Sequence, residues 1–160
     1  RKYEPYKRWT SDDWYMMRLE IMYLMSQKPN LAITLKTNDN TPFIAWKSIF
    51  DKWLIRVNDK FVGRRWRKKD QNQLTFCIVF LENPFLNTHA HGMLRYPKST
   101  RQWEHEDKER HLEDAWKKLV PYGSIYTEYP YNPERWASYC TKKFAPWNYS
   151  GRMLISNEGY

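Results

Sequence analysis

The sequence predicts an α+β domain in which helices pack on a central antiparallel sheet. Segments of strand period alternate with segments of helix period, and two of the strands are joined by a short connection. Hydrophobic residues make up 41% of the chain and charged residues 28%, as in folded globular domains. The 160 residues suffice for one domain and are too few for two ordinary ones, so we expect a single domain over residues 1–160.

The first expected element is a helix that begins near Ser11. The Ser11 hydroxyl can cap it, and the carboxylates of Asp12 and Asp13 favour its positively polarised first turn. Its apolar residues then fall on one face, namely Trp14, Met17, Ile21, Leu24 and Met25. Pro29 ends this helix, and residues 31–37 alternate in the period of a strand.

A second helix follows Thr41 and Pro42, because proline suits the first position of a helix. Its apolar stripe recurs every three or four residues and contains Trp46, Ile49, Phe50, Trp53, Leu54 and Val57. Residues 74–82 are apolar on both faces, which favours a strand in the interior of the sheet. Residues 83–87 turn the chain, and residues 88–96 form the next strand.

A third helix is expected over residues 100–120, with a buried stripe of Leu112, Ala115, Trp116 and Leu119. Residues 124–129 then form a short strand. The last helix begins at Asn132 and Pro133 and runs to Phe144. The tail can add a short strand at residues 153–156.

From residue 31 the predicted order is strand, helix, strand, strand, helix, strand. This is the split β-α-β arrangement of ferredoxin-like domains, with one extra helix at each end. The core of the domain would span residues 31–144. Residues 1–28 would form a helical extension before it, and residues 145–160 a tail after it.

The composition favours a polyanionic partner. Lys and Arg number 27 against 18 Asp and Glu, which gives a net charge of +9. Aromatic residues make up 18%, and rings mixed with cations suit single-stranded nucleic acid, although most of these rings are expected in the core. The densest cluster is a basic stretch that would grip phosphates around one stacking indole: Arg64, Arg65, Trp66, Arg67, Lys68 and Lys69. The alternative is a targeting tract or a solubilising loop.

Nothing in the sequence predicts a membrane protein or a secreted one. The longest apolar run, Phe76 to Leu81, has six residues, whereas a spanning helix needs about 20. No charged-then-apolar leader follows Arg1, so we expect no signal peptide. Cys77 and Cys140 match no metal spacing and indicate buried thiols in a reducing, intracellular compartment.

A metal site is predicted at the two strands on either side of the turn at residues 83–87. His89 and His91 are two apart in a strand, so both imidazoles lie on one face, and imidazole is the commonest metal ligand. Glu82 closes the preceding strand, where a carboxylate after an apolar run needs a partner. Two nitrogens and one oxygen leave coordination positions open, and this ligand set suits Mn²⁺ or Mg²⁺. The alternatives are hydrogen-bonded, half-buried histidines and a glutamate paired with an N–H or a lysine.

A candidate nucleophile lies in the last helix. Residues three and four apart share a helix face, so Tyr139 would lie beside Lys142 and Lys143. A phenol titrates near pH 10, and a nearby ammonium or a metal-bound phosphate favours its reactive phenolate form. The alternative is that Tyr139 is simply one of twelve tyrosines on a solvated face.

Taken in order, these segments resemble the HUH endonucleases, and most closely the rolling-circle replication initiators. The strand LAITLK, which ends at Lys36, resembles the first family motif, and THAHGML resembles the metal motif, with Ala90 where a bulky residue is usual. The segment SYCTKK resembles the Tyr-x-x-Lys nucleophile motif, and Glu82 stands seven residues before His89, as the acidic ligand does in viral initiators. The resemblance covers residues 31–144. The helix before them departs from many viral initiators, and the single tyrosine in the nucleophile motif suggests a single-tyrosine enzyme.

The resemblance implies an HUH or RRM-like domain that nicks and rejoins single-stranded DNA at an origin or hairpin-like site. Tyr139 would attack a phosphodiester to give a 5′-phosphotyrosine and a free 3′-hydroxyl, Lys142 would orient the phosphate, and Lys36 and Lys143 would contact the DNA. The ion would be Mn²⁺ or Mg²⁺. A helicase domain or replication machinery would be partners, and no Gly-x-x-x-x-Gly-Lys loop occurs here.

Other assignments remain open from the sequence. Within the same superfamily the chain can be a single-tyrosine transposase or relaxase. Outside it, the same surface suits a nucleic-acid-binding module without chemistry, or a structural or sensory metal domain. The expected location is the cytoplasm for a bacterial or plasmid protein and the host nucleus for a protein of a eukaryotic virus.

Overall fold

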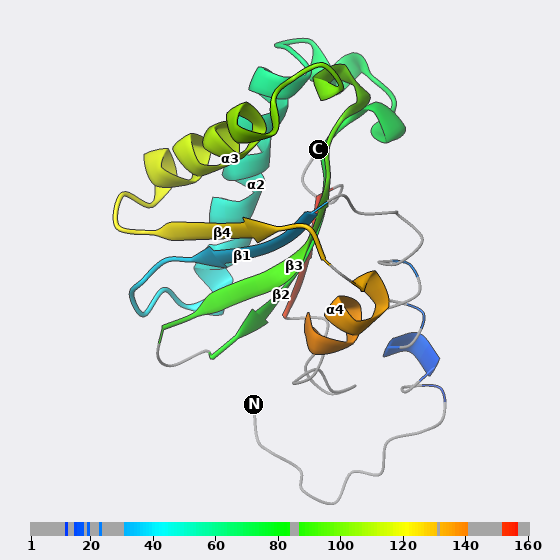
Figure 1. Ribbon diagram of the computed structural model, residues 1–160. Coiled ribbons are helices and arrows are strands. Elements are labelled where there is room, and N and C mark those ends of the chain that lie inside the picture. Colours follow the sequence, from blue (N-terminus) through cyan, green and yellow to red (C-terminus); the bar gives the residue numbers. More distant parts are fainter. Residues whose placement is uncertain are drawn as a thin grey trace, which may run out of the picture.

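The computed structural model covers the chain from Arg1 to Tyr160. The residues it describes are 12, 15–17, 19, 23, 31–83, 87–130, 132–140 and 152–156. The sheet, the three helices packed on it and the residues of the candidate site fall within these ranges (Figure 1).

Five strands form one antiparallel sheet in the spatial order β4-β1-β3-β2-β5. Their bounds are Leu31–Lys36 for β1, Phe76–Glu82 for β2, His89–Arg95 for β3, Ser124–Glu128 for β4 and Met153–Ile155 for β5. The strand order β4-β1-β3-β2 and the sequence of elements are compatible with a ferredoxin-like fold. The added strand β5 pairs with the outer edge of β2.

The helices occupy both faces of the sheet. Helices α2 (Phe43–Phe61) and α3 (His105–Leu119) pack together on one face, and the shorter α4 (Pro133–Cys140) lies on the other (Figure 1). Within the described residues no helix has the length and apolar character needed to cross a membrane.

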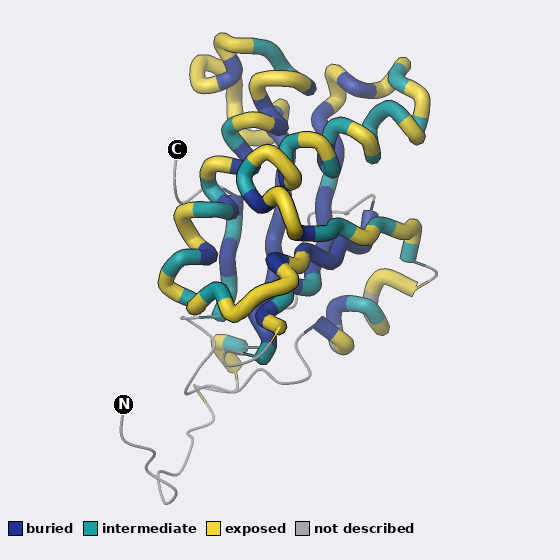
Figure 2. The backbone as a smooth tube through the Cα atoms, turned by 90° about the vertical axis from the view of Figure 1, so that its left-hand side faces the viewer, coloured by how far each residue is buried: buried dark blue, intermediate teal, exposed yellow. Residues whose placement is uncertain are grey.

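The main core lies between the sheet and helices α2 and α3. Three buried tryptophans form its centre: Trp46 packs on Trp116 with centroids 5.7 Å apart, and Trp53 meets Trp116 edge to face at 6.0 Å. The indoles of Trp53 and Trp116 donate to the carbonyls of Leu112 and Lys36. Figure 2 shows the strands buried in the middle of the molecule and exposed positions along the outer helices.

Gly92 sets the close approach of β2 and β3. A Cβ atom at this position would lie 1.8 Å from the carbonyl oxygen of Ile78, so no larger residue fits without moving the strand backbone. The tight contact fixes the register of β2 against β3, and this register places Glu82, His89 and His91.

Most predicted elements are confirmed where the structure describes them. All seven residues of β2 are buried, as expected for an interior strand, and the tail adds β5 at Met153–Ile155. The third helix begins at His105 and not at residue 100, because residues 98–100 form a short 3-10 turn in which the Thr100 hydroxyl donates to Pro97 O.

The predictions for the two ends of the chain are tested only in part. Asp12, residues 15–17, Leu19 and Tyr23 are helical, and the rest of the expected helix at residues 11–26 lies outside the described residues. The last helix is described from Pro133 to Cys140; the expected continuation to Phe144 lies outside the described residues, as does most of the tail.

Candidate metal centre

Neighbouring strands bring the three predicted ligands together. Glu82 is the last residue of β2 and His89 the first of β3, and the two are directly opposite in the antiparallel register. His91 follows two residues later, opposite Phe80. Because side chains alternate along a strand, all three lie on the sheet face that carries α4.

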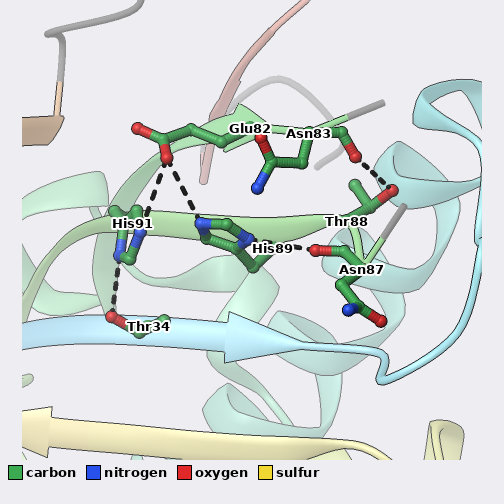
Figure 3. A network of polar contacts seen from close by, with 7 residues as sticks. All are labelled: Thr34, Glu82, Asn83, Asn87, Thr88, His89 and His91. Atoms are coloured by element: carbon green, nitrogen blue, oxygen red, sulfur yellow. Dashed lines mark hydrogen bonds and ion pairs between the residues drawn. The ribbon is translucent and has the colours of Figure 1, made fainter. Parts of the chain in front are cut away.

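The turn between the strands is built from residues that tolerate its backbone. Asn83 and Asn87 have φ values of 57° and 50°, in the left-handed region that asparagine adopts more readily than most residues. The buried Thr88 hydroxyl donates to the Asn83 carbonyl over 3.0 Å and closes the turn, as Figure 3 shows. The turn thus holds Glu82 and His89 opposite each other.

The ligand atoms converge on one carboxylate oxygen. Oε2 of Glu82 lies 3.2 Å from Nε2 of His89 and 3.8 Å from Nε2 of His91 (Figure 3). The candidate ligand atoms of the three residues all lie within 4.8 Å of one another. Ligands bound about 2.1 Å from one ion lie roughly 3.0–3.5 Å apart in octahedral or tetrahedral geometry, so this cluster could hold a metal ion.

In both histidines Nε2 faces Glu82, and a contact at Nδ1 orients the ring. Nδ1 of His89 lies 3.0 Å from the Asn87 carbonyl, which only accepts, so Nδ1 carries the proton and Nε2 presents a lone pair in the neutral ring. Nδ1 of His91 lies 2.9 Å from the Thr34 hydroxyl on β1. Such outer contacts fix ring orientation at metal sites.

The carboxylate of Glu82 fits a bound cation. Glu82 is 3% exposed, and among the described residues its Oε1 has no hydrogen-bond partner. With the ring neutral, the lone pair on His89 Nε2 faces Oε2 of Glu82 over 3.2 Å, and two acceptors at this distance need a proton or a cation between them. A divalent ion would satisfy both atoms and offset the cost of burying the carboxylate.

Tyr139 lies beside this centre. Its ring packs against that of His91 with centroids 5.6 Å apart, and stacks on Trp136 at 5.2 Å with the planes 18° apart. Trp136 is fixed because its indole donates to the Gly92 carbonyl over 2.7 Å. Tyr139 is 45% exposed, so its side chain is accessible to a large substrate while remaining next to a candidate ligand.

The predicted lysines are partly described. Lys36 ends β1 opposite His89 in the register, which places it on the edge of the ligand cluster, and it is exposed. Lys142 and Lys143 lie outside the described residues.

The basic stretch at residues 64–69 is remote from the metal centre. It precedes β2 in the chain, whereas Glu82 is at the far end of that strand, whose seven residues span about 20 Å. The prediction of a stacking indole there is wrong: Trp66 is 1% exposed, donates to Asp59 and is covered by the Arg67 guanidinium. Its burial against α2 leaves no free ring face. All five cations of the stretch are exposed, namely Arg64, Arg65, Arg67, Lys68 and Lys69.

Three residues of the site were missed from sequence. Thr34 and Asn87 orient the imidazoles, and Trp136 joins Tyr139 to the sheet. Thr34 shares the strand face of Lys36, but its meeting with His91 depends on a register between distant segments. Comparison with known proteins gave no match to any protein family, curated protein or solved structure.

Proposed function

We propose that this protein is a metal-dependent single-stranded DNA endonuclease and strand transferase of the HUH type. In this proposal Tyr139 is the nucleophile, and Glu82, His89 and His91 hold a divalent ion. The observation that carries the proposal is the packing of the Tyr139 ring on His91, which puts a phenol next to a three-ligand cluster on one sheet face.

The ligand set favours particular ions. One carboxylate and two imidazoles suit Mn²⁺, and Mg²⁺ accepts the carboxylate while keeping several waters. When bound, the ion would polarise a non-bridging oxygen of the scissile phosphate and hold the phosphate for in-line displacement. Thr34 and Asn87 would keep both imidazoles aimed at it.

The proposed step exchanges one phosphodiester for another. The Tyr139 oxygen forms a bond to phosphorus, the bond from phosphorus to the 3′ oxygen breaks, and the phenol proton is lost while the 3′ oxygen gains one. The products are a 5′-phosphotyrosine and a free 3′-hydroxyl. A phenolate leaves more readily than an alkoxide, so the 3′-hydroxyl can later reverse the step without ATP.

The charge of the chain supports a nucleic-acid substrate. The net charge of +9 favours a polyanion, and Lys36 lies at the ligand cluster where a phosphate would approach. In this proposal Lys142 and Lys143 follow Tyr139 and add positive charge near the phosphate, and the cations of residues 64–69 bind a more distant part of the strand.

The test is a covalent adduct. The protein is incubated with Mn²⁺ and a labelled single-stranded DNA pool of random sequence, and denaturing electrophoresis measures label that stays with the protein. We expect an adduct whose tryptic peptide contains Tyr139. Tyr139→Phe should abolish the adduct and retain DNA binding, whereas Tyr122→Phe, on a tyrosine 89% exposed in a turn, should keep it.

Two results would contradict the proposal. An adduct that persists in Tyr139→Phe would assign the nucleophile elsewhere. DNA binding with no adduct under Mn²⁺ or Mg²⁺ would identify a binding module without chemistry.

A further inference from the structure

A pocket is lined by Tyr139 and by residues outside the ligand cluster. It has a volume of about 430 Å³, which is within the usual range of small-ligand sites. Its lining comes from the end of β4, the following loop and one side of α4, and consists of Glu128, Pro130, Asn132, Arg135, Trp136 and Tyr139. Because Tyr139 borders both the pocket and His91, a ligand in the pocket would be the immediate neighbour of a group reacting at Tyr139.

Two rings form an ordered wall of this pocket. Trp136 and Tyr139 stack with their planes 18° apart, and His91 meets the Trp136 ring edge to face with centroids 6.0 Å apart. The bond from the Trp136 indole to Gly92 O ties the pair to β3. A rigid aromatic wall of this kind favours a flat ligand, and a nucleobase gains stacking energy on it whatever its sequence.

Glu128 is out of place on a surface that binds a polyanion. It is an exposed carboxylate at the end of β4, and its Cα partner on β1 is the small residue Ala32. A carboxylate repels phosphates, so at this position it favours DNA binding only by accepting hydrogen bonds from a base. The Tyr126 hydroxyl lies 3.5 Å from its Oε2, and a carboxylate has about four acceptor sites, so acceptor capacity remains.

Base chemistry decides which nucleotide suits this acceptor. Guanine offers two adjacent N–H donors, from N1 and N2, that match the two oxygens of a carboxylate. Adenine and cytosine offer one amino group beside an acceptor nitrogen. Thymine offers one N–H between two carbonyl oxygens, which a carboxylate repels.

We infer that the pocket between β4 and α4 binds a base that flanks the cleaved phosphodiester, and that Glu128 selects guanine there and rejects thymine. The base stacks on the Trp136 and Tyr139 wall, and the exposed Arg135 lies at the pocket for the adjoining phosphate. This inference rests on the proposed nicking activity and adds the base preference at the site.

The experiment compares the sequences that form adducts. Wild-type protein, Glu128→Gln and Glu106→Gln are each incubated with Mn²⁺ and the random pool, and the captured DNA is sequenced around the cleaved bond. In the wild type we expect guanine over thymine by about tenfold at one position flanking that bond, the usual size of a bidentate contact. Glu128→Gln should remove this preference, because an amide both donates and accepts. Glu106→Gln makes the same charge change on α3, on the other sheet face, and should leave the preference intact.

A second measurement uses binding, and not cleavage, as its readout. Tyr139→Phe protein is titrated in EDTA with two labelled oligonucleotides that differ only in guanine or thymine at the flanking position, and fluorescence anisotropy reports affinity. Adducts with the same base profile in wild type and Glu128→Gln, or equal affinities for the two oligonucleotides, would overturn the inference and leave the nicking activity standing. No adduct from the wild type would overturn both.

Discussion

The ring of Tyr139 meets the ring of His91 at an angle of 68° with centroids 5.6 Å apart. The two residues are far apart in the sequence, because His91 is in β3 and Tyr139 is in α4, which follows β4. Their contact joins a cluster of candidate metal ligands to an accessible phenol. Because the two rings are in contact, a shift of the His91 imidazole would also shift the Tyr139 side chain.

Thr34→Val should weaken metal binding without unfolding the protein. Valine keeps the shape of threonine but removes the hydroxyl that contacts Nδ1 of His91. Loss of such an orienting contact costs about 10–100-fold in metal affinity. Isothermal titration with Mn²⁺ measures the change; Thr34→Ser, which keeps the hydroxyl, should bind nearly as well as the wild type. Equal affinities of Thr34→Val and the wild type would show that the contact is not needed.

Mn²⁺ should stabilise the wild type and leave Glu82→Gln unaffected. A ligand at 100 times its Kd adds about 2.7 kcal/mol to the free energy of unfolding, which raises the Tm of a chain this size by roughly 5–10 °C. Glu82 supplies the single carboxylate of the cluster. Thermal denaturation with and without EDTA measures the shift, and a similar shift in the variant would place the ion elsewhere.

His111 should make stability fall as the pH drops below neutrality. Burial beside Trp103 and Phe61, with smaller contributions from Lys60 and Arg110, lowers the pKa of His111; Asp114 and Asp107 act in the opposite direction. The unfolded chain therefore takes up the proton first, near its ordinary pKa of about 6.5. The contribution to stability is complete above that pH and is lost toward the lower folded pKa.

The matched variant for this effect is His111→Phe, which keeps an aromatic ring and removes the titrating group. Urea midpoints at several pH values between 5 and 7.5 should fall less steeply with decreasing pH in the variant than in the wild type. Parallel curves would mean that other groups cause the dependence.

The exposed cations of residues 64–69 should contribute to DNA affinity through their charge. Trp66 should instead contribute to the free energy of folding. Replacing Arg64 and Arg65 with alanine should reduce the slope of log affinity against log salt by about 1.4 if each contacts one phosphate of a single strand. Trp66→Ala should cost about 3–5 kcal/mol of folding free energy, because a buried ring is removed. Anisotropy across a salt series and urea unfolding measure the two effects. An unchanged slope would show that the stretch does not contact DNA.

The parts of the fold and site that follow from short-range sequence patterns were predictable. Period-two alternation placed His89 and His91 on one face, and the short turn placed Glu82 beside them. The contact of Thr34 with His91 was not predictable, because it depends on the register of β1 against β3, which long-range packing sets. Trp66 was misassigned because five neighbouring cations indicate solvent, whereas contacts with α2 bury the ring.

Alternate residues of β3 face opposite layers. His89 and His91 face the candidate site, while Ala90 and Leu94 belong to the core under α2 and α3. A slip of β3 by one residue would turn both imidazoles inward and expose the core residues. Correct burial of Leu94 and correct aim of the ligands are therefore one folding outcome, and an insertion or deletion of one residue between His89 and Arg95 should disrupt both.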